Sequence, residues 1–155
     1  MNNSIKLMAL WLASSAVCLA QMPMVNAPPG EMRVAARGPS YSLALEAAQT
    51  ALESCEAKGA IVSVSVVDSA GVLKILLAGD GADLKSVTSS TWKAITAIAF
   101  KTPISELGTK VVRGGLPMLV GDQVVGGIGV GGGHGGNIDE DCARAGLEKI
   151  QKRLS

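Results

Sequence analysis

The only histidine of the chain, His134, stands inside a run of glycines at residues 131–136. Residues 111–136 contain 11 of the 19 glycines, and the run comes just before a predicted helix. Free N–H groups and the positive dipole end at a helix N-terminus favour a bound carboxylate or phosphate, and Gly132 and Gly133 would offer such groups. A lone histidine in a glycine loop is more often simply exposed to solvent. A ligand-binding role and a solvent-exposed role for His134 therefore both stay open.

A second set of chemically useful side chains shares one face of a helix predicted over residues 85–101. Its members recur at i, i+4, i+7 and i+11 and are Ser89, Lys93, Thr96 and Phe100. A cation, a hydroxyl and a flat ring on one helix face can hold a carboxylate beside an apolar plate. The alternative is that Lys93 is solvated, or that it pairs with Asp68 or Asp80.

Arg113 is a second candidate for binding an anion, because it directly precedes Gly114 and Gly115. The alternative is an ordinary surface arginine. No catalytic residue can be assigned from the sequence. With a single histidine, nothing in the spacing supports a Ser–His–Asp triad, and no pair of carboxylates stands in a recognisable catalytic setting.

Three helices and two hairpins are predicted to position these residues. The helices cover residues 41–58 and 85–101 and a C-terminal segment with Asn137 as its N-cap. The strands cover residues 61–68, 72–77, 116–120 and 124–130. Hairpins rather than β-α-β crossovers imply an α/β (α+β) fold, with a largely antiparallel sheet and helices packed on it.

Residue patterns also predict which faces of these elements are buried. Alternating Val and Ser in residues 61–68 indicates a half-buried strand. Glycine inside residues 124–130 indicates that something approaches that strand closely. The helix over residues 41–58 is predicted to bury an alanine-rich stripe. The helix over residues 85–101 is predicted to bury a different set, formed by Val87, Thr91, Ala94, Ile95 and Ile98.

The first 27 residues look like a secretion signal, because Lys6 precedes an apolar stretch of the expected length. Cleavage is expected after Ala20 or after Ala27. Residues 28–40 are rich in Pro and Gly and are predicted to be a flexible leader that orders only if it docks. Residues 41–155 then form the domain, and a periplasmic or secreted location is expected.

The charge balance argues against two classes of partner. The whole chain has 14 Lys and Arg against 13 Asp and Glu, so the loss of Lys6 with the signal leaves no net charge. There is no basic run and no interleaving of basic and aromatic residues. Nucleic acid and, for the mature form, membrane surfaces are therefore not expected partners.

Two of the three cysteines, Cys55 and Cys142, remain once the signal is removed. In an oxidising compartment they could form a disulfide. The sequence favours the other interpretation, two small buried hydrophobic side chains on helices, because free cysteine is commonly buried.

Four ordered segments carry a resemblance to a known family. They are Val66-Val67-Asp68-Ser69-Ala70-Gly71; Asp80-Gly81-Ala82 with Lys93-Ala94-Ile95-Thr96-Ala97; Gly114-Gly115-Leu116-Pro117; and Val125-Gly126-Gly127-Ile128-Gly129-Val130 with Asp139-Glu140-Asp141-Cys142-Ala143-Arg144-Ala145-Gly146. In this order and spacing, over residues 43–150, the chain resembles the GlcG/HbpS-like haem-binding (haem-degrading) domain family. One departure is a shorter connection, residues 102–113, before the Gly-Gly-x-Pro element.

The resemblance implies a profilin-like fold, with a sheet of about five strands, that assembles into homo-oligomers, often octamers. It also implies haem or a related small molecule as the ligand. His134 is then the candidate axial ligand of the haem iron, and Lys93, Thr96, Phe100, Arg113 and the glycines at 114, 115, 132 and 133 are candidates to line the site.

Three hypotheses follow. The first is a secreted or periplasmic haem-binding protein in haem storage, sensing or degradation, and it favours binding over catalysis. The second is an enzyme or accessory protein that binds a small carboxylate at the same residues. The third is an assembly module whose alanine-rich and glycine-rich faces pack subunits together.

Overall fold

The computed structural model of the chain describes residues 36–108, 112–134 and 136–155. The predicted secretion signal and most of the predicted leader lie outside the described residues. The described end of the leader docks on the domain. The carbonyl of Arg37 accepts a hydrogen bond of 2.8 Å from the N–H of Ser69, and the guanidinium of Arg37 donates to Gln123.

The order of elements is helix, hairpin, helix, hairpin, helix, as the sequence predicted. The helices are α1 (Tyr41–Glu56), α2 (Leu84–Phe100) and α3 (Asn137–Ile150). Two short 3-10 helices follow α2 and α3, and they are η1 (Ile104–Glu106) and η2 (Gln151–Arg153). The strands are β1 (Ser63–Asp68), β2 (Leu73–Ala78), β3 (Gly115–Val120) and β4 (Gln123–Gly131).

The four strands form one sheet in the order β2-β1-β4-β3, and every neighbouring pair is antiparallel. The α/β fold with an antiparallel sheet is therefore confirmed. The expectation of about five strands was slightly too high, since the described residues contain four. The strands of each predicted hairpin pair with one another, β1 with β2 and β3 with β4. The pairing of β1 with β4 joins the two hairpins into one sheet.

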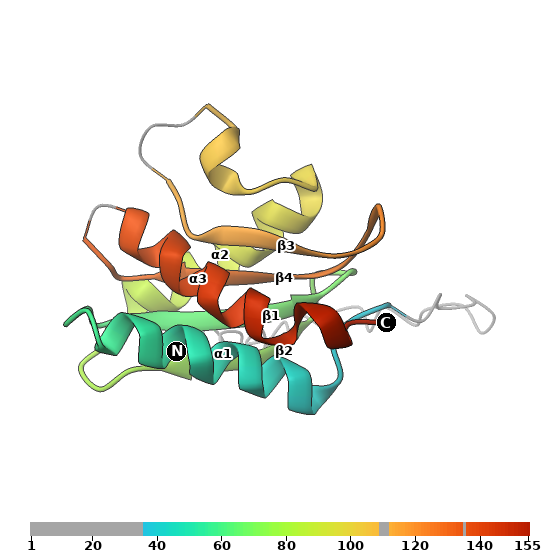
Figure 1. Cartoon of the computed structure of the whole chain (residues 1–155). Coiled ribbons are helices and arrows are strands. Elements are labelled where there is room, and N and C mark those ends of the chain that lie inside the picture. Colours follow the sequence, from blue (N-terminus) through green and yellow to red (C-terminus); the bar gives the residue numbers. More distant parts are fainter. Residues whose placement is uncertain (1–35, 109–111, 135) are drawn as a thin grey trace, which may run out of the picture. The chain divides into compact units, whose positions relative to one another are not determined.

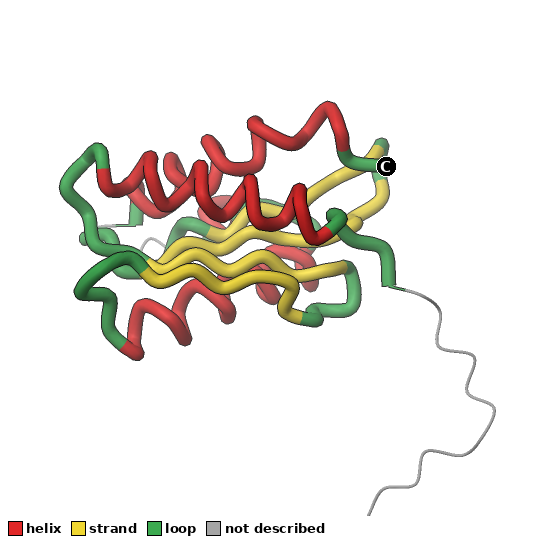
Figure 2. Tube along the Cα trace, turned by 90° about the horizontal axis from the view of Figure 1, so that it is seen from below, coloured by secondary structure: helices red, strands yellow, loops and turns green. Residues whose placement is uncertain are grey.

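Helices cover both faces of the sheet. α1 and α3 lie on one face and α2 lies on the other (Figures 1 and 2). All six residues of β1 are consequently buried, so the prediction of a half-buried strand was wrong. Ser63 and Ser65 can be buried because their hydroxyls pair with Ser86 Oγ at 2.9 Å and Ser90 Oγ at 2.8 Å.

The buried stripe of α2 differs from the predicted one. It is formed mainly by small and polar residues, which are Ser86, Ser90, Lys93, Ala94 and Ala97. Ile95, predicted to be buried, is 40% exposed. The reason lies in β4, where a Cβ atom at Gly127 would stand 2.7 Å from the carbonyl oxygen of Ala94. Glycine lets the backbones of α2 and β4 meet, as the glycine-bearing strand predicted, and leaves no room for large side chains between them.

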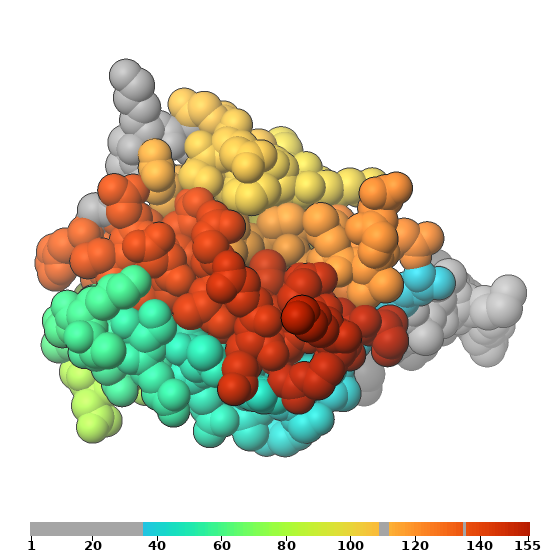
Figure 3. Space-filling model, viewed as in Figure 1, coloured from blue at the N-terminus to red at the C-terminus, as the bar shows by residue number. Residues whose placement is uncertain are grey.

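α1 and α3 pack side by side on the other face (Figure 3). The alanine stripe of α1 is buried as predicted. Cys55 and Cys142 are fully buried as well, but they form a disulfide with a Cα–Cα distance of 5.6 Å. The favoured prediction of two unpaired thiols was therefore wrong. Small residues on the facing surfaces bring the two helices close enough for the sulfur atoms to bond.

The start of α3 also differs from prediction. Gly136, not Asn137, is the N-cap residue, with a φ of 74° that favours glycine, and no side chain caps the helix. Asp139, in the first turn of the helix, is 2% exposed. A buried carboxylate needs partners, and those partners define the site described next.

Candidate functional site

A cleft of about 830 Å³ lies between the N-terminal half of α2 and the glycine loop, which we define in the structure as residues 131–134. α2 contributes Lys85, Ser89 and Trp92 to its lining, and the loop contributes Gly132, Gly133 and His134. Further lining residues come from the turn before α2 and from Ile61 and Val112. Clefts of this volume suit a drug-sized or cofactor-sized ligand.

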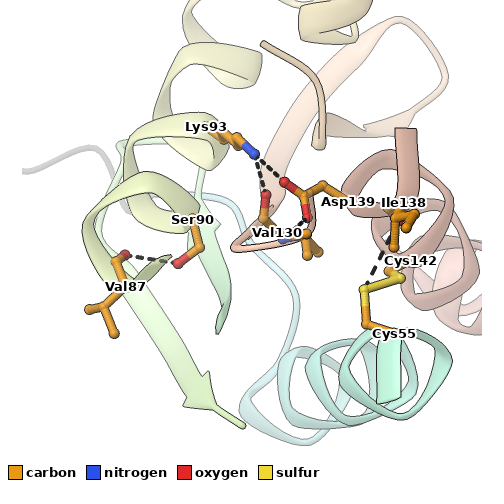
Figure 4. Close-up of polar contacts among 9 residues, drawn as sticks. Cys55, Val87, Ser90, Lys93, Val130, Ile138, Asp139 and Cys142 are labelled. Atoms are coloured by element: carbon orange, nitrogen blue, oxygen red, sulfur yellow. Dashed lines mark hydrogen bonds and ion pairs between the residues drawn. A yellow bond between two sulfur atoms is a disulfide. The ribbon is translucent and has the colours of Figure 1, made fainter. Parts of the chain in front are cut away.

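Lys93 lines the cleft, and Figure 4 shows its ammonium held by two oxygen atoms. Its Nζ donates a hydrogen bond of 2.7 Å to the carbonyl oxygen of Val130 and forms an ion pair of 2.6 Å with Oδ2 of Asp139. The side chains of Lys93 and Asp139 are only 8% and 3% exposed. A charge-assisted hydrogen bond in such a water-poor place is stronger than one on the surface.

The other oxygen of Asp139 binds the glycine loop. Asp139 Oδ1 accepts a hydrogen bond of 2.8 Å from the N–H of Gly133. One carboxylate thus joins α3, α2 and the loop, while Lys93 joins α2 to the end of β4. At this buried pair, Lys93 of α2 meets three consecutive stretches of the chain, which are the end of β4, the loop and the start of α3.

Glycines make the convergence possible. A Cβ atom at Gly133 would clash with Oδ1 of Asp139. A Cβ atom at Gly114 would stand 2.8 Å from the carbonyl oxygen of Val130 and would also crowd the Asp139 side chain. Gly114 and Gly132 have φ values of 98° and 118°, which larger residues rarely adopt. These glycines let the backbone close around the ion pair.

The structure brings four of the predicted site residues together. Lys93, Gly132, Gly133 and His134 all line the cleft, so these candidate residues do lie together, and their role in binding a ligand stays a prediction. Lys93 is neither solvated nor paired with Asp68 or Asp80, since Asp139 is its acidic partner.

The other predicted residues do not line the cleft. Thr96 and Phe100 lie beyond Lys93 towards the C-terminal end of α2, and Phe100 is 62% exposed. Arg113 is exposed and packs beside Gly136. Gly114 and Gly115 contact residues of the buried ion pair rather than the cleft. Gly114 packs against Asp139, and Gly115 packs against the carbonyl oxygen of Lys93. Their predicted roles in ligand binding stay predictions.

Sequence reasoning missed three residues of this region: Lys85, Trp92 and Asp139. Lys85 and Ser89 stand eight and four residues before Lys93, so the helix stripe could have been extended towards the N-terminus of α2 as well as towards Phe100. Trp92 adjoins Lys93 and is 53% exposed. Nothing in the sequence distinguishes Asp139 from Glu140 and Asp141 in the same turn.

Two searches of the described residues bear on other kinds of site. Residues 36–108, 112–134 and 136–155 contain no group of three or more His, Cys, Asp and Glu side chains that could hold a metal ion. Among the same residues, no helix is both long enough and apolar enough to cross a membrane.

Comparison with known proteins places the chain among haem-related proteins. A family model described as "Haem degrading protein HbpS-like" matches residues 40–148. The structure is similar to Streptomyces reticuli HbpS in a double-mutant form, with 34% identity, a TM-score of 0.71, and coverage of 80% of this chain and 94% of that one.

Two further solved structures resemble the chain. One is a complex of PduOC with haem, at 25% identity and a TM-score of 0.68, covering 73% of this chain and 95% of that chain. The other is the Klebsiella pneumoniae protein ORFY, at 25% identity and a TM-score of 0.66, covering 71% of this chain and 88% of that one. Curated protein sequences yield no match.

Proposed function

Because the chain belongs to the HbpS-like family of haem-degrading proteins, we propose that it binds haem in the cleft between α2 and the glycine loop. The observation that carries the proposal is that an exposed aromatic ring and the only imidazole of the chain line the same cleft. A relative of the same fold, PduOC, has been crystallised with haem. Bound haem would supply the iron and its redox chemistry, and the protein would supply binding and orientation.

Trp92 offers a flat apolar surface to the porphyrin. It projects from α2 into the cleft and is 53% exposed, which is unusual for a large aromatic side chain that could otherwise be buried in the core. Ile61, which is 55% exposed, adds apolar surface to the same cleft. A planar hydrophobic ligand would cover both side chains.

His134 and Lys85 are the polar residues we propose to contact haem. The imidazole of His134 would bind the iron, since histidine is a common axial ligand. Lys85 would bind a propionate. It is exposed, lines the cleft and forms no ion pair with any described residue. Lys93 is less suited to that task, because Asp139 and Val130 already occupy two of its three N–H donors.

The same contacts weigh against a small-carboxylate enzyme. Besides Arg113, which is exposed outside the cleft, the groups expected to hold a substrate carboxylate are the ammonium of Lys93 and the N–H of Gly133. In the structure both are occupied by the carboxylate of Asp139. A metabolite would have to displace a buried, paired side chain in order to bind there. Haem binding along the cleft requires no such displacement.

A haemin titration tests the proposal, with two readouts. The Soret band should shift and saturate, and His134→Ala should change the axial-ligand features of the spectrum. Fluorescence should report contact with Trp92, since Trp11 is the only other tryptophan and lies in the predicted signal. Trp92→Leu should weaken binding, whereas Phe100→Leu, on the same helix but outside the cleft, is the matched control. Non-saturable adsorption, or equal effects of the two substitutions, would refute the proposal.

We also propose a periplasmic or secreted location. The pattern of residues 1–27 supports it, and so does the buried disulfide, because structural disulfides persist in oxidising compartments and are rare in the cytosol. The measurement is the N-terminal sequence of the protein recovered from an exported fraction. Cleavage after Ala20 or Ala27 is expected, and a protein found only in the cytosol with an intact N-terminus would contradict the location.

We propose, finally, that the chain forms a homo-oligomer. Apart from Trp92, which we assign to the haem site, three large apolar side chains on α2 are exposed, and they are Leu84, Ile95 and Phe100. Exposed apolar surface of this kind is commonly covered by a partner. The mass of the protein in solution decides the question, and an octamer is the state that the family resemblance implies. A monomer at micromolar concentration would dismiss the proposal.

A further inference from the structure

We infer that Asp139 is the positioning residue of the haem site: its carboxylate, paired with Lys93, holds the glycine loop in the conformation that places His134 in the cleft. The inference rests on the proposed function for its consequence, which is haem ligation. Its structural premise concerns the hydrogen bond between the loop and α3 and can be tested without haem.

The carboxylate contacts the loop next to the histidine. Asp139 Oδ1 accepts from the N–H of Gly133 at 2.8 Å, and His134 is the following residue. A bond to the backbone one residue before a side chain restricts where that side chain can lie. His134 itself has no such anchor of its own, since it is exposed and forms no hydrogen bond with any other described residue.

Lys93 orients the carboxylate so that it can make this bond. Oδ2 of Asp139 receives the 2.6 Å ion pair from Lys93, and the same ammonium is bound to the carbonyl oxygen of Val130 at 2.7 Å. Val130 lies in β4 and Gly133 lies just beyond the end of that strand. The lysine therefore fixes the acid relative to the strand from which the loop departs.

This position requires a carboxylate rather than any polar group. Both oxygens of Asp139 face N–H donors, and the side chain is 3% exposed, so water cannot replace either partner readily. An asparagine has one oxygen and one NH₂ group. In either orientation its NH₂ group would face a donor, Lys93 or Gly133. The charged ammonium of Lys93 binds the amide oxygen more strongly than a backbone N–H does, so the bond to the loop would be lost.

The loss can be reversed by a second substitution, which separates positioning from charge. In Lys93→Met/Asp139→Asn, no ammonium opposes the amide NH₂ group, so the amide oxygen can turn to Gly133. The loop bond is then restored without either charge. If Lys93 served haem directly, through a propionate, this double variant would recover the loop bond but still bind haem defectively.

The experiment compares the wild-type protein with three variants. These are Asp139→Asn, Lys93→Met/Asp139→Asn, and the control Asp141→Asn, which removes a carboxylate from the same helix turn at a side chain that is 66% exposed. The first readout is the hydrogen exchange rate of the Gly133 amide, measured by NMR in the absence of haem. The second is the haemin spectrum and affinity. Thermal unfolding verifies that each variant is folded.

We expect the Gly133 amide to be protected in the wild-type protein and in Asp141→Asn. In Asp139→Asn its exchange should be faster by roughly ten- to hundredfold, the effect of losing one hydrogen bond to a charged group. The double variant should recover most of the protection. With haemin, Asp139→Asn should give the axial-ligand spectrum of His134→Ala, and the double variant should regain that of the wild-type protein.

Three results would overturn the inference. They are an unprotected Gly133 amide in the wild-type protein, unchanged protection in a folded Asp139→Asn variant, and a double variant that recovers protection but not the wild-type haem spectrum. The first can be observed even if every variant fails to fold. A wild-type protein that does not bind haemin but shows the expected exchange pattern would refute the proposed function and leave the positioning role of Asp139 standing.

Discussion

Removing the Cys55–Cys142 disulfide is expected to lower the free energy of unfolding by several kcal/mol. The bond joins the end of α1 to the first half of α3 across a sequence separation of 87 residues. In the chain-entropy treatment, a closed loop of that length removes roughly 15 cal/mol/K from the unfolded state, which is about 4.6 kcal/mol at 25 °C. Residual structure in the unfolded chain reduces this figure, so a loss of about 2 to 5 kcal/mol is expected.

That loss is large for a domain of this size. Residues 41–155 form roughly 115 residues, for which the entropy of unfolding is on the order of 0.24 kcal/mol/K. The unfolding midpoint should therefore fall by about 8 to 20 °C. Since domains are commonly stable by only about 5 to 15 kcal/mol, the reduced protein can approach the limit of stability.

The assay is thermal unfolding followed by circular dichroism, with and without a reductant. The unfolding midpoint of the wild-type protein should fall on reduction. The midpoint of Cys55→Ala/Cys142→Ala should already be low and should not change when the reductant is added. Thiol titration in denaturant should find two fewer thiols before reduction than after it. Equal thiol counts would show that the bond is absent. A reductant-insensitive wild-type midpoint, with the bond shown to be reduced, would refute the entropy argument.

Two further predictions concern the contacts of α2 that shape the cleft. Gly129→Ala should destabilise the fold by about 1 to 3 kcal/mol or more, because the added methyl group would lie 2.6 Å from the backbone nitrogen of Ala94 and force α2 away from β4. Urea unfolding measures this loss of stability. A free energy of unfolding within about 0.5 kcal/mol of the wild-type value would contradict the close approach of α2 and β4. Asp83→Ala should cost about 1 kcal/mol, because Asp83 Oδ1 caps α2 by accepting from the N–H of Ser86 at 2.7 Å. Asp80→Ala, at the exposed acid three residues earlier, is its control, and equal losses for the two variants would argue against capping.

Much of the fold could be predicted because it depends on local patterns. The hairpins follow from apolar runs separated by turn residues, and each strand pair closes over a short connection. The alanine spacing in residues 41–58 correctly indicated the buried face of α1. The approach of something to the glycine-bearing strand was also predictable, because glycine within a strand has few other uses.

What covers that strand could not be predicted. Ile95 and Ile98 look like core residues by hydrophobicity, yet the face of α2 that is buried carries Ser86, Ser90 and Lys93. Small residues are buried in preference to Ile95 and Ile98 because they allow the closest approach of α2 and β4. Their hydroxyls form hydrogen bonds with serines of β1. The residue pattern of α2 by itself does not show that the hydroxyls of Ser86 and Ser90 have hydrogen-bond partners on another element.

Sequence alone singled out Lys93, by its place on a helix face, and the glycine loop, by its composition, and the family resemblance made both candidates for one site. Only the tertiary structure shows that the ammonium of Lys93 forms its ion pair with Asp139, rather than with a ligand or another acid, and that Trp92 faces the cleft. The physical reason is that a buried charge is stabilised only by the partner that arrives from elsewhere in the chain. Asp139, Glu140 and Asp141 are neighbours on α3, and the rotation of α3 about its axis decides which of them faces Lys93. That rotation is set by the packing of α3 against α1.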